Sequence, residues 1–202
     1  MATRGFVGRR PTEDIARRLP PGQHLTTDFP VLAFGPTPAV DLARWRFTIK
    51  QGPKPLASWN WDEFEALPQT RWQGDIHCVT TGSKFDTDWT GVAIDDLFAA
   101  AGVEPPTPWL LARSFDDYST NVPVADLVGG KAMVATRFGG LPLAPEHGGP
   151  ARLLVPHLYF WKSAKWVNQL QFTDRDEAGF WELRGYHLYG DPWREQRYTD
   201  DP

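Results

Sequence analysis

Residues 142–156 have the sequence PLAPEHGGPARLLVP, in which His147 and Arg152 flank a run of glycine and proline. Glycine allows a ligand to approach the backbone closely, and an arginine side chain donates hydrogen bonds in a fork that matches phosphate. The sequence Lys162-Ser163-Ala164-Lys165 follows soon afterwards and adds two cationic side chains. Either stretch alone is more typical of an exposed loop. Together they favour a site for a large anionic ligand.

The segments on both sides of this stretch have the pattern of short strands. Between Arg44 and Lys50, the apolar residues Trp45, Phe47 and Ile49 occupy every second position. This alternation predicts a strand with one buried face. Further strands are expected over residues 71–80, 109–113, 131–138, 151–155 and 166–173, with a hairpin at Gly139-Gly140.

Two short helices are expected among these strands. Asn60 and Glu63 have the spacing of a capping box, which predicts a helix that ends before Pro68. A second helix is expected over residues 92–101, because Gly102 is the usual residue after a helix C-terminus. Several strands without a regular alternation of strand and helix predict a mixed α+β fold rather than a doubly wound parallel sheet.

The two ends of the chain have different compositions. Prolines and glycines in residues 1–40 predict loops that drape over the rest of the fold, with residues 1–20 as a flexible arm. The end after Gly185 is expected to pack down through aromatic anchors, which are Tyr186, Tyr189, Trp193 and Tyr198. No repeat or linker divides the sequence. Residues 1–202 are therefore expected to form a single domain.

The composition excludes several classes of protein. Hydrophobic residues make up 41% of the chain and charged residues 23%, as in a folded globular protein. The net charge of −4 gives no general attraction for nucleic acid or an anionic membrane. No apolar run approaches the roughly 20 residues that cross a bilayer. We expect no nucleic-acid partner, no membrane and a cytoplasmic location, with which a single cysteine agrees.

Cys78 is the only cysteine, and the residues around it leave three interpretations open. A free cysteine is most often a small buried hydrophobe. It can also be the nucleophile of a thiol hydrolase, but the adjacent His77 would point to the opposite face of a strand. The third possibility is a single thiolate ligand to a metal whose other ligands come from a cofactor. A zinc site is not expected, because structural zinc uses four cysteine or histidine ligands.

Five ordered motifs resemble the molybdopterin-binding domain of the sulfite oxidase family. They are Asp75–Thr80, Trp89–Val92, Tyr118–Pro123, Pro142–Pro156 and Lys162–Val167. The resemblance extends from about residue 20 to the C-terminus, and it is closer to the short, single-domain bacterial sulfite oxidase-like oxidoreductases. It implies the mixed-sheet α+β fold of that domain and a molybdenum–molybdopterin cofactor.

The resemblance also implies roles for individual residues. Cys78 matches the protein thiolate on molybdenum, and Tyr118 matches the tyrosine beside the metal that orients or protonates an oxo group. The implied cofactor-binding residues are Ser114, His147, Arg152, Ser163, Ala164 and Lys165. The implied reaction is oxygen-atom transfer to or from a small sulfur or nitrogen oxo compound. Its partners are that small oxyanion or oxo substrate and an external electron carrier.

This sequence departs from sulfite oxidases in the loop after Cys78, which has no arginine. Lys84 or Arg113 could replace that positive charge, but the resemblance does not fix sulfite as the substrate. No Cys-x-x-Cys-His motif is present, and no haem is expected. The alternative is a degenerate family member that acts as a non-catalytic cofactor-binding or interaction module. The retention of Cys78 argues against it.

Overall fold

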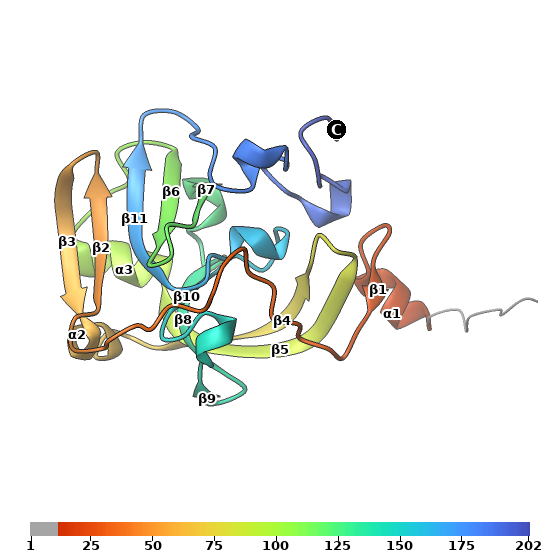
Figure 1. Ribbon diagram of the computed structural model, residues 1–202, viewed down its shortest axis with the longest axis horizontal. Coiled ribbons are helices and arrows are strands. Elements are labelled where there is room, and N and C mark those ends of the chain that lie inside the picture. Colours follow the sequence, from red (N-terminus) through yellow and green to blue (C-terminus); the bar gives the residue numbers. More distant parts are fainter. Residues whose placement is uncertain (1–11) are drawn as a thin grey trace, which may run out of the picture.

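The computed structural model describes residues 12–202, which fold around two mixed β-sheets with few helices (Figure 1). Part of the arm expected over residues 1–20, namely residues 1–11, lies outside the described residues. The rest contains helix α1 (Glu13–Arg18), in which Arg18 Nε donates to Asp75 Oδ2 at 2.8 Å. This contact joins α1 to the first sheet.

The first sheet holds the segments that later form the functional site. Its strands are β1 (His24–Leu25), β4 (Thr70–His77), β5 (Gly82–Ala93), β8 (Met133–Phe138), β9 (Leu141–Pro142) and β10 (Arg152–Leu154). The order is β1-β5-β8-β10, with β4 also paired to β5 and β9 to β8. β1 runs parallel to β5, and the other pairs are antiparallel.

The second sheet forms one wall of the main core. Its order is β3 (Lys54–Asn60), β2 (Arg46–Gln51), β11 (Val167–Thr173), β6 (Trp109–Ser114) and β7 (Ser119–Pro123). Helices α2 (Trp61–Glu65) and α3 (Ile94–Ala101) lie beside this sheet in Figure 1. The side chains of Trp45, Phe47 and Ile49 are completely buried, which confirms the alternation seen in the sequence. The mixed α+β fold is confirmed.

Short 3-10 helices connect the later strands. They are η1 (Val124–Asp126), η2 (Pro145–His147), η3 (Phe160–Lys162), η4 (Glu182–Arg184) and η5 (Pro192–Arg194). The longest helix in residues 12–202 is α3 with eight residues, so none of the helices there could span a bilayer.

Three of the predicted local signals are confirmed. Asn60 and Glu63 form a complete capping box at the start of α2. Gly102 ends α3 with φ of 62°. Gly139 and Gly140 both have positive φ in the turn from β8 to β9, a conformation that glycine adopts without strain.

Other boundaries differ from the prediction. The helix expected over residues 92–101 begins at Ile94, because the two preceding residues are the end of β5 and pair with β8. The strand expected over residues 71–80 ends at His77, because the chain turns back at Cys78 toward β5. At the C-terminal end, Trp193 and Tyr198 are about half exposed, and the ring of Tyr198 packs against that of Tyr186. Tyr186 and Tyr189 are partly buried, as expected.

The N-terminal loops drape over the first sheet, as the sequence predicts. We call residues 24–34 the strap. The Thr26 backbone N–H donates to Ser83 O at 2.9 Å, and Lys84 Nζ donates to Thr27 O at 2.5 Å. These bonds fix the strap against β5, close to Cys78.

Candidate functional site

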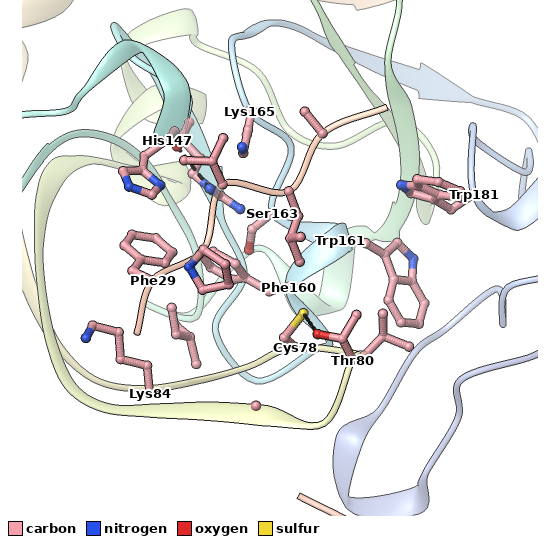
Figure 2. Close-up of a pocket in the computed structure, with 18 of the residues that line it drawn as sticks. Phe29, Cys78, Thr80, Lys84, His147, Phe160, Trp161, Ser163, Lys165 and Trp181 are labelled. Atoms are coloured by element: carbon pink, nitrogen blue, oxygen red, sulfur yellow. Dashed lines mark hydrogen bonds between the residues drawn. The ribbon is translucent and has the colours of Figure 1, made fainter. Parts of the chain in front are cut away.

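A cavity of about 590 Å³ lies between the strap, the end of β4 and the chain around η3. It is lined by six of the eight predicted site residues, which are Cys78, Tyr118, His147, Arg152, Ser163 and Lys165. Figure 2 shows that Cys78, His147, Ser163 and Lys165 surround one space. Segments far apart in the sequence therefore meet at one site.

Ser114 and Ala164 do not line this cavity. Both are buried, and the hydroxyl of Ser114 has no hydrogen-bond partner in the described structure. The carbonyl of Ala164 accepts the Leu153 N–H at 2.9 Å and so belongs to the local backbone network. Their contact with a cofactor stays a prediction.

Cys78 is presented to the cavity by a tight turn. Its N–H donates to Gly82 O at 2.8 Å, and its carbonyl accepts the Thr81 N–H at 3.0 Å. Its Sγ lies 3.0 Å from Thr80 Oγ1 and faces the cavity (Figure 2). Because Cys78 is only partly buried and lines an open space, the structure does not support the small-hydrophobe interpretation.

His77 lies on the other side of the chain, as the strand geometry predicts. Its Nδ1 is 2.8 Å from Ser83 Oγ, and burial lowers its pKa. It does not line the cavity, so it is not placed to take a proton from the Cys78 thiol. No group of three or more histidine, cysteine, aspartate or glutamate side chains in residues 12–202 is arranged to hold a metal ion. A metal at Cys78 would need most of its ligands from a cofactor.

Arg152 is a buried cation on β10 that lacks a carboxylate partner among the described residues. Its guanidinium stacks on the Phe160 ring at 3.9 Å, and its Nη1 donates to His147 O at 2.9 Å. Its Nε has no hydrogen-bond partner within residues 12–202. Burial lowers the pKa of Arg152 to about 9.

His147 and Lys165 lie on the same side of the cavity. The His147 ring stacks on Phe29 of the strap with centroids 4.2 Å apart, and its buried Nδ1 has no hydrogen-bond partner among the described residues. Lys165 Nζ donates to Glu146 O at 2.7 Å. Burial, and then the charge on Arg152, lower the pKa of Lys165 to about 8. An anion bound here would pair with both cations and would raise the pKa of each, which favours their charged forms.

Tyr118 lines the cavity, but its hydroxyl is already engaged. It donates to Trp161 O at 2.6 Å. Burial raises the pKa of Tyr118 well above its usual range, so the group stays protonated. In this arrangement the proton belongs to a backbone hydrogen bond, and the predicted proton transfer to an oxo group would require that bond to break.

The structure distinguishes between Lys84 and Arg113 as the cation that could hold an anionic substrate. Lys84 lines the cavity, whereas the guanidinium of Arg113 lies on the second sheet and donates to Gln171 Oε1 at 3.1 Å. Sequence analysis missed two other parts of the lining. These are the strap and the aromatic residues Trp161, Trp181 and Tyr186. The sequence predicted draped N-terminal loops and packed C-terminal aromatic residues. It contains no motif that places either of them next to Cys78.

Comparison with known proteins gives the family. The model of the oxidoreductase molybdopterin binding domain matches residues 34–181. This chain belongs to that family. The prediction of a molybdopterin-binding oxidoreductase of the sulfite oxidase type is confirmed, and the matched range contains all the predicted site residues.

Relatives within the molybdopterin-binding family cover this chain to different extents. The uncharacterized oxidoreductase YuiH of Bacillus subtilis (strain 168) is 39% identical over 197 residues, which span 97% of this chain and 100% of YuiH. The putative protein-methionine-sulfoxide reductase subunit YedZ1 of Azospira oryzae is 25% identical over 84% of this chain and 66% of that protein.

A solved structure has the same fold. The sulfane dehydrogenase SoxCD of Paracoccus pantotrophus superposes with a TM-score of 0.61 at 24% sequence identity. The match covers 69% of this chain and 40% of the SoxCD chain. The similarity supports the mixed-sheet architecture of a molybdopterin-binding domain.

Proposed function

We propose that this chain is a single-domain molybdenum–pterin oxidoreductase that transfers an oxygen atom to or from a small sulfur or nitrogen oxo compound. The observation that carries this proposal is the position of the Cys78 thiol in one cavity with Arg152 and Lys165, two cations without a carboxylate partner in the described structure. A soft thiolate suits molybdenum, and the cations suit an anionic cofactor.

The residues present fit a molybdopterin. The buried His147 Nδ1 and Arg152 Nε both lack partners in the described structure, and both belong to residues that line the cavity. Ser163 Oγ accepts the Val155 N–H at 2.9 Å, which leaves its own O–H free to donate. Cys78 would hold the metal, and His147, Arg152, Ser163 and Lys165 would hold the organic part of the cofactor.

The chain and the cofactor have separate tasks in this proposal. In the reducing direction, an oxide, two electrons and two protons give the deoxygenated compound and water, and an external carrier supplies the electrons. Bound molybdenum would supply the two-electron redox chemistry. Cys78 would hold the metal at the turn after β4, Arg152 and Lys165 would neutralise the cofactor, and the strap forms one wall of the cavity.

The relatives support the same chemical class. The name of YedZ1 gives that protein a sulfoxide substrate, which is a sulfur oxo compound. The chain covers only about two-thirds of YedZ1. We therefore propose only the chemical class of the substrate for this chain, and not the substrate or electron carrier of YedZ1.

The metal content of the purified protein tests this proposal. We expect about one molybdenum and one pterin per chain after expression in a host that makes the cofactor, and no Soret band of haem in the absorption spectrum. Protein from a host that cannot make the cofactor is the matched control. A folded protein that stays free of molybdenum in the competent host would support the non-catalytic module instead.

A further inference from the structure

The cavity has two ends of different chemistry, with Cys78 between them. Figure 2 shows Lys84, His147 and Lys165 on one side of Cys78 and the indoles of Trp161 and Trp181 on the other. The cationic end is the part that we assign to the cofactor. The aromatic end is therefore the part of the cavity next to Cys78 that is left for a substrate.

Three aromatic side chains build this second end, which we call the aromatic chamber. Tyr186 packs against both Trp161 and Trp181, with ring centroids 5.2 Å apart in each pair. Trp161 Nε1 donates to the buried Glu182 Oε1 at 2.9 Å, and the Tyr186 N–H donates to Trp181 O at 3.1 Å. The first bond fixes the Trp161 ring, and the second fixes the backbone of Tyr186 beside that of Trp181. Trp161 and Trp181 lie within the matched residues 34–181, and Tyr186 lies outside them.

The aromatic chamber has no cation of its own. Among the lysines and arginines of residues 12–202, those that line the cavity are Lys84, Arg152 and Lys165. Each of them donates to a backbone carbonyl, namely Thr27 O, His147 O and Glu146 O. An oxyanion in the chamber would lose its hydration without gaining a counter-charge, which is costly. A neutral molecule with an apolar group would instead gain contact with the indole rings.

Among the residues that the structure describes, two polar groups of the chamber residues have no hydrogen-bond partner, namely the Tyr186 hydroxyl and the Trp181 indole N–H. The Tyr186 hydroxyl makes no hydrogen bond with any residue of the described structure, although the side chain lines the cavity. Its pKa is raised by burial and then by negative charge on Tyr198 and Cys78, so the hydroxyl keeps its proton. Tyr118, by contrast, already donates to Trp161 O.

We propose that the substrate is a neutral organic oxide, with an S=O or N–O group on an apolar framework, rather than an oxyanion. This inference rests on the oxygen-atom transfer proposed above. The apolar part of the substrate lies on Trp161 and Trp181, and its oxygen accepts a hydrogen bond from the Tyr186 hydroxyl. In the reducing direction, a dialkyl or aryl alkyl sulfoxide, two electrons from a reduced external carrier and two protons give the corresponding thioether and water. The sulfur–oxygen bond breaks, and the oxygen leaves with both protons.

Binding to the isolated holoenzyme tests the chamber without turnover. We expect methyl phenyl sulfoxide to give a calorimetric binding isotherm, and sulfite and nitrate to bind at least tenfold more weakly. Trp181→Leu is expected to weaken sulfoxide binding about tenfold. Trp193→Leu is the matched control, because Trp193 is half exposed and does not line the cavity. Equal loss in both variants, or tighter binding of sulfite than of the sulfoxide, would overturn the inference.

Turnover of the same compounds tests the hydrogen bond. With reduced viologen as the electron donor, Tyr186→Phe is expected to lower kcat/KM for methyl phenyl sulfoxide about tenfold, the typical effect of one hydrogen bond. Tyr189→Phe is the control, because that hydroxyl donates to Asp126 outside the cavity. Unchanged kcat/KM in Tyr186→Phe would overturn the inference.

The two proposals fail in different ways. Preferential turnover of sulfite or nitrate by the holoenzyme would overturn the neutral substrate and leave oxygen-atom transfer intact. A protein with a full complement of molybdenum that converts none of these compounds, in either direction, would overturn the proposed function itself.

Discussion

Lys165 and Arg152 illustrate how single residues reveal a binding site. Both are long cations, and the pKa of each falls on burial, to about 8 for Lys165 and about 9 for Arg152. Neither forms an ion pair within the described residues. Such groups are costly unless an anion compensates them. The free-energy cost of burying these two cations without an anion therefore indicates that an anionic ligand binds here.

The pKa of Lys165 predicts how anion binding depends on pH. Its pKa in the folded protein is about 8, against an ordinary value of 10.5. Between these values the unfolded chain holds a proton that the folded protein has lost, so this group makes the cofactor-free protein more stable as pH rises. Anion binding has the opposite sign, because Lys165 must be charged. We expect the ratio of the wild-type affinity for inorganic pyrophosphate to that of Lys165→Met to be flat below about pH 7 and to fall above pH 8, by up to tenfold per pH unit.

Calorimetry of pyrophosphate binding to the cofactor-free protein between pH 6.5 and 9.5 measures this dependence. Lys165→Met is expected to bind more weakly at pH 7 and to lose the decline near pH 8. The same decline in wild-type and Lys165→Met would show that another group titrates.

At the scale of elements, the sequence predicted β2 but not β5, for a physical reason. The buried face of β2 consists of apolar side chains, so alternation is visible. In β5 the buried positions include Ser83 and Thr87, which bond to His77 and to Gly74 O. Buried polar groups that find partners do not show up in a hydrophobic pattern. The resulting 12-residue strand was not foreseen.

Gly91 shows how tightly β5 packs on β8. A Cβ atom at this position would lie 2.1 Å from Val134 O and 2.5 Å from Ala135 Cα. Because both atoms belong to the backbone, the strands would have to separate. We expect Gly91→Ala to lower the free energy of unfolding by about 1–3 kcal/mol.

Urea denaturation measures this loss. Gly35→Ala is the matched control, because nothing lies within 4 Å of its Cβ position and its φ is not in the left-handed region. We expect a change within about 0.5 kcal/mol there. Equal effects of the two substitutions would contradict the close approach of β5 and β8.

At the scale of the whole molecule, a buried ion pair ties the C-terminal segment to the site. The Lys162 ammonium donates to Glu182 Oε1 at 2.7 Å, and both side chains are fully buried. Lys162 Nζ also donates to Leu188 O and to the Asn121 side chain. Removing one partner leaves the other charge buried and unpaired.

Lys162→Met is expected to lower the free energy of unfolding by about 3–5 kcal/mol. The double variant Lys162→Met with Glu182→Gln is expected to recover part of that loss, because it leaves no buried charge. Thermal and urea unfolding measure both changes. The exposed pair of Arg71 and Asp88 is the comparison, and Arg71→Ala should cost less than about 1 kcal/mol. If Lys162→Met lowered the free energy of unfolding by no more than Arg71→Ala does, the buried pair would not be important for stability.

The candidate site was predictable only where the chain itself carries a pattern. The stretch 142–156, the Cys78 segment and Lys162–Lys165 could be recognised as ordered motifs. The strap and the wall formed by Trp181 and Tyr186 could not, because only folding brings these distant segments to the cavity. Of the missed parts, Trp181 and Tyr186 lie at the aromatic end of the cavity, whereas Phe29 of the strap stacks on His147 at the cationic end.

The central claim is that the Cys78 thiolate is a ligand of molybdenum. X-ray absorption at the molybdenum edge tests it directly, on wild-type protein and on Cys78→Ser, both purified from a host that makes the cofactor. We predict that the metal in Cys78→Ser has one sulfur neighbour fewer than the metal in the wild type. The same number of sulfur neighbours in both proteins would contradict the account.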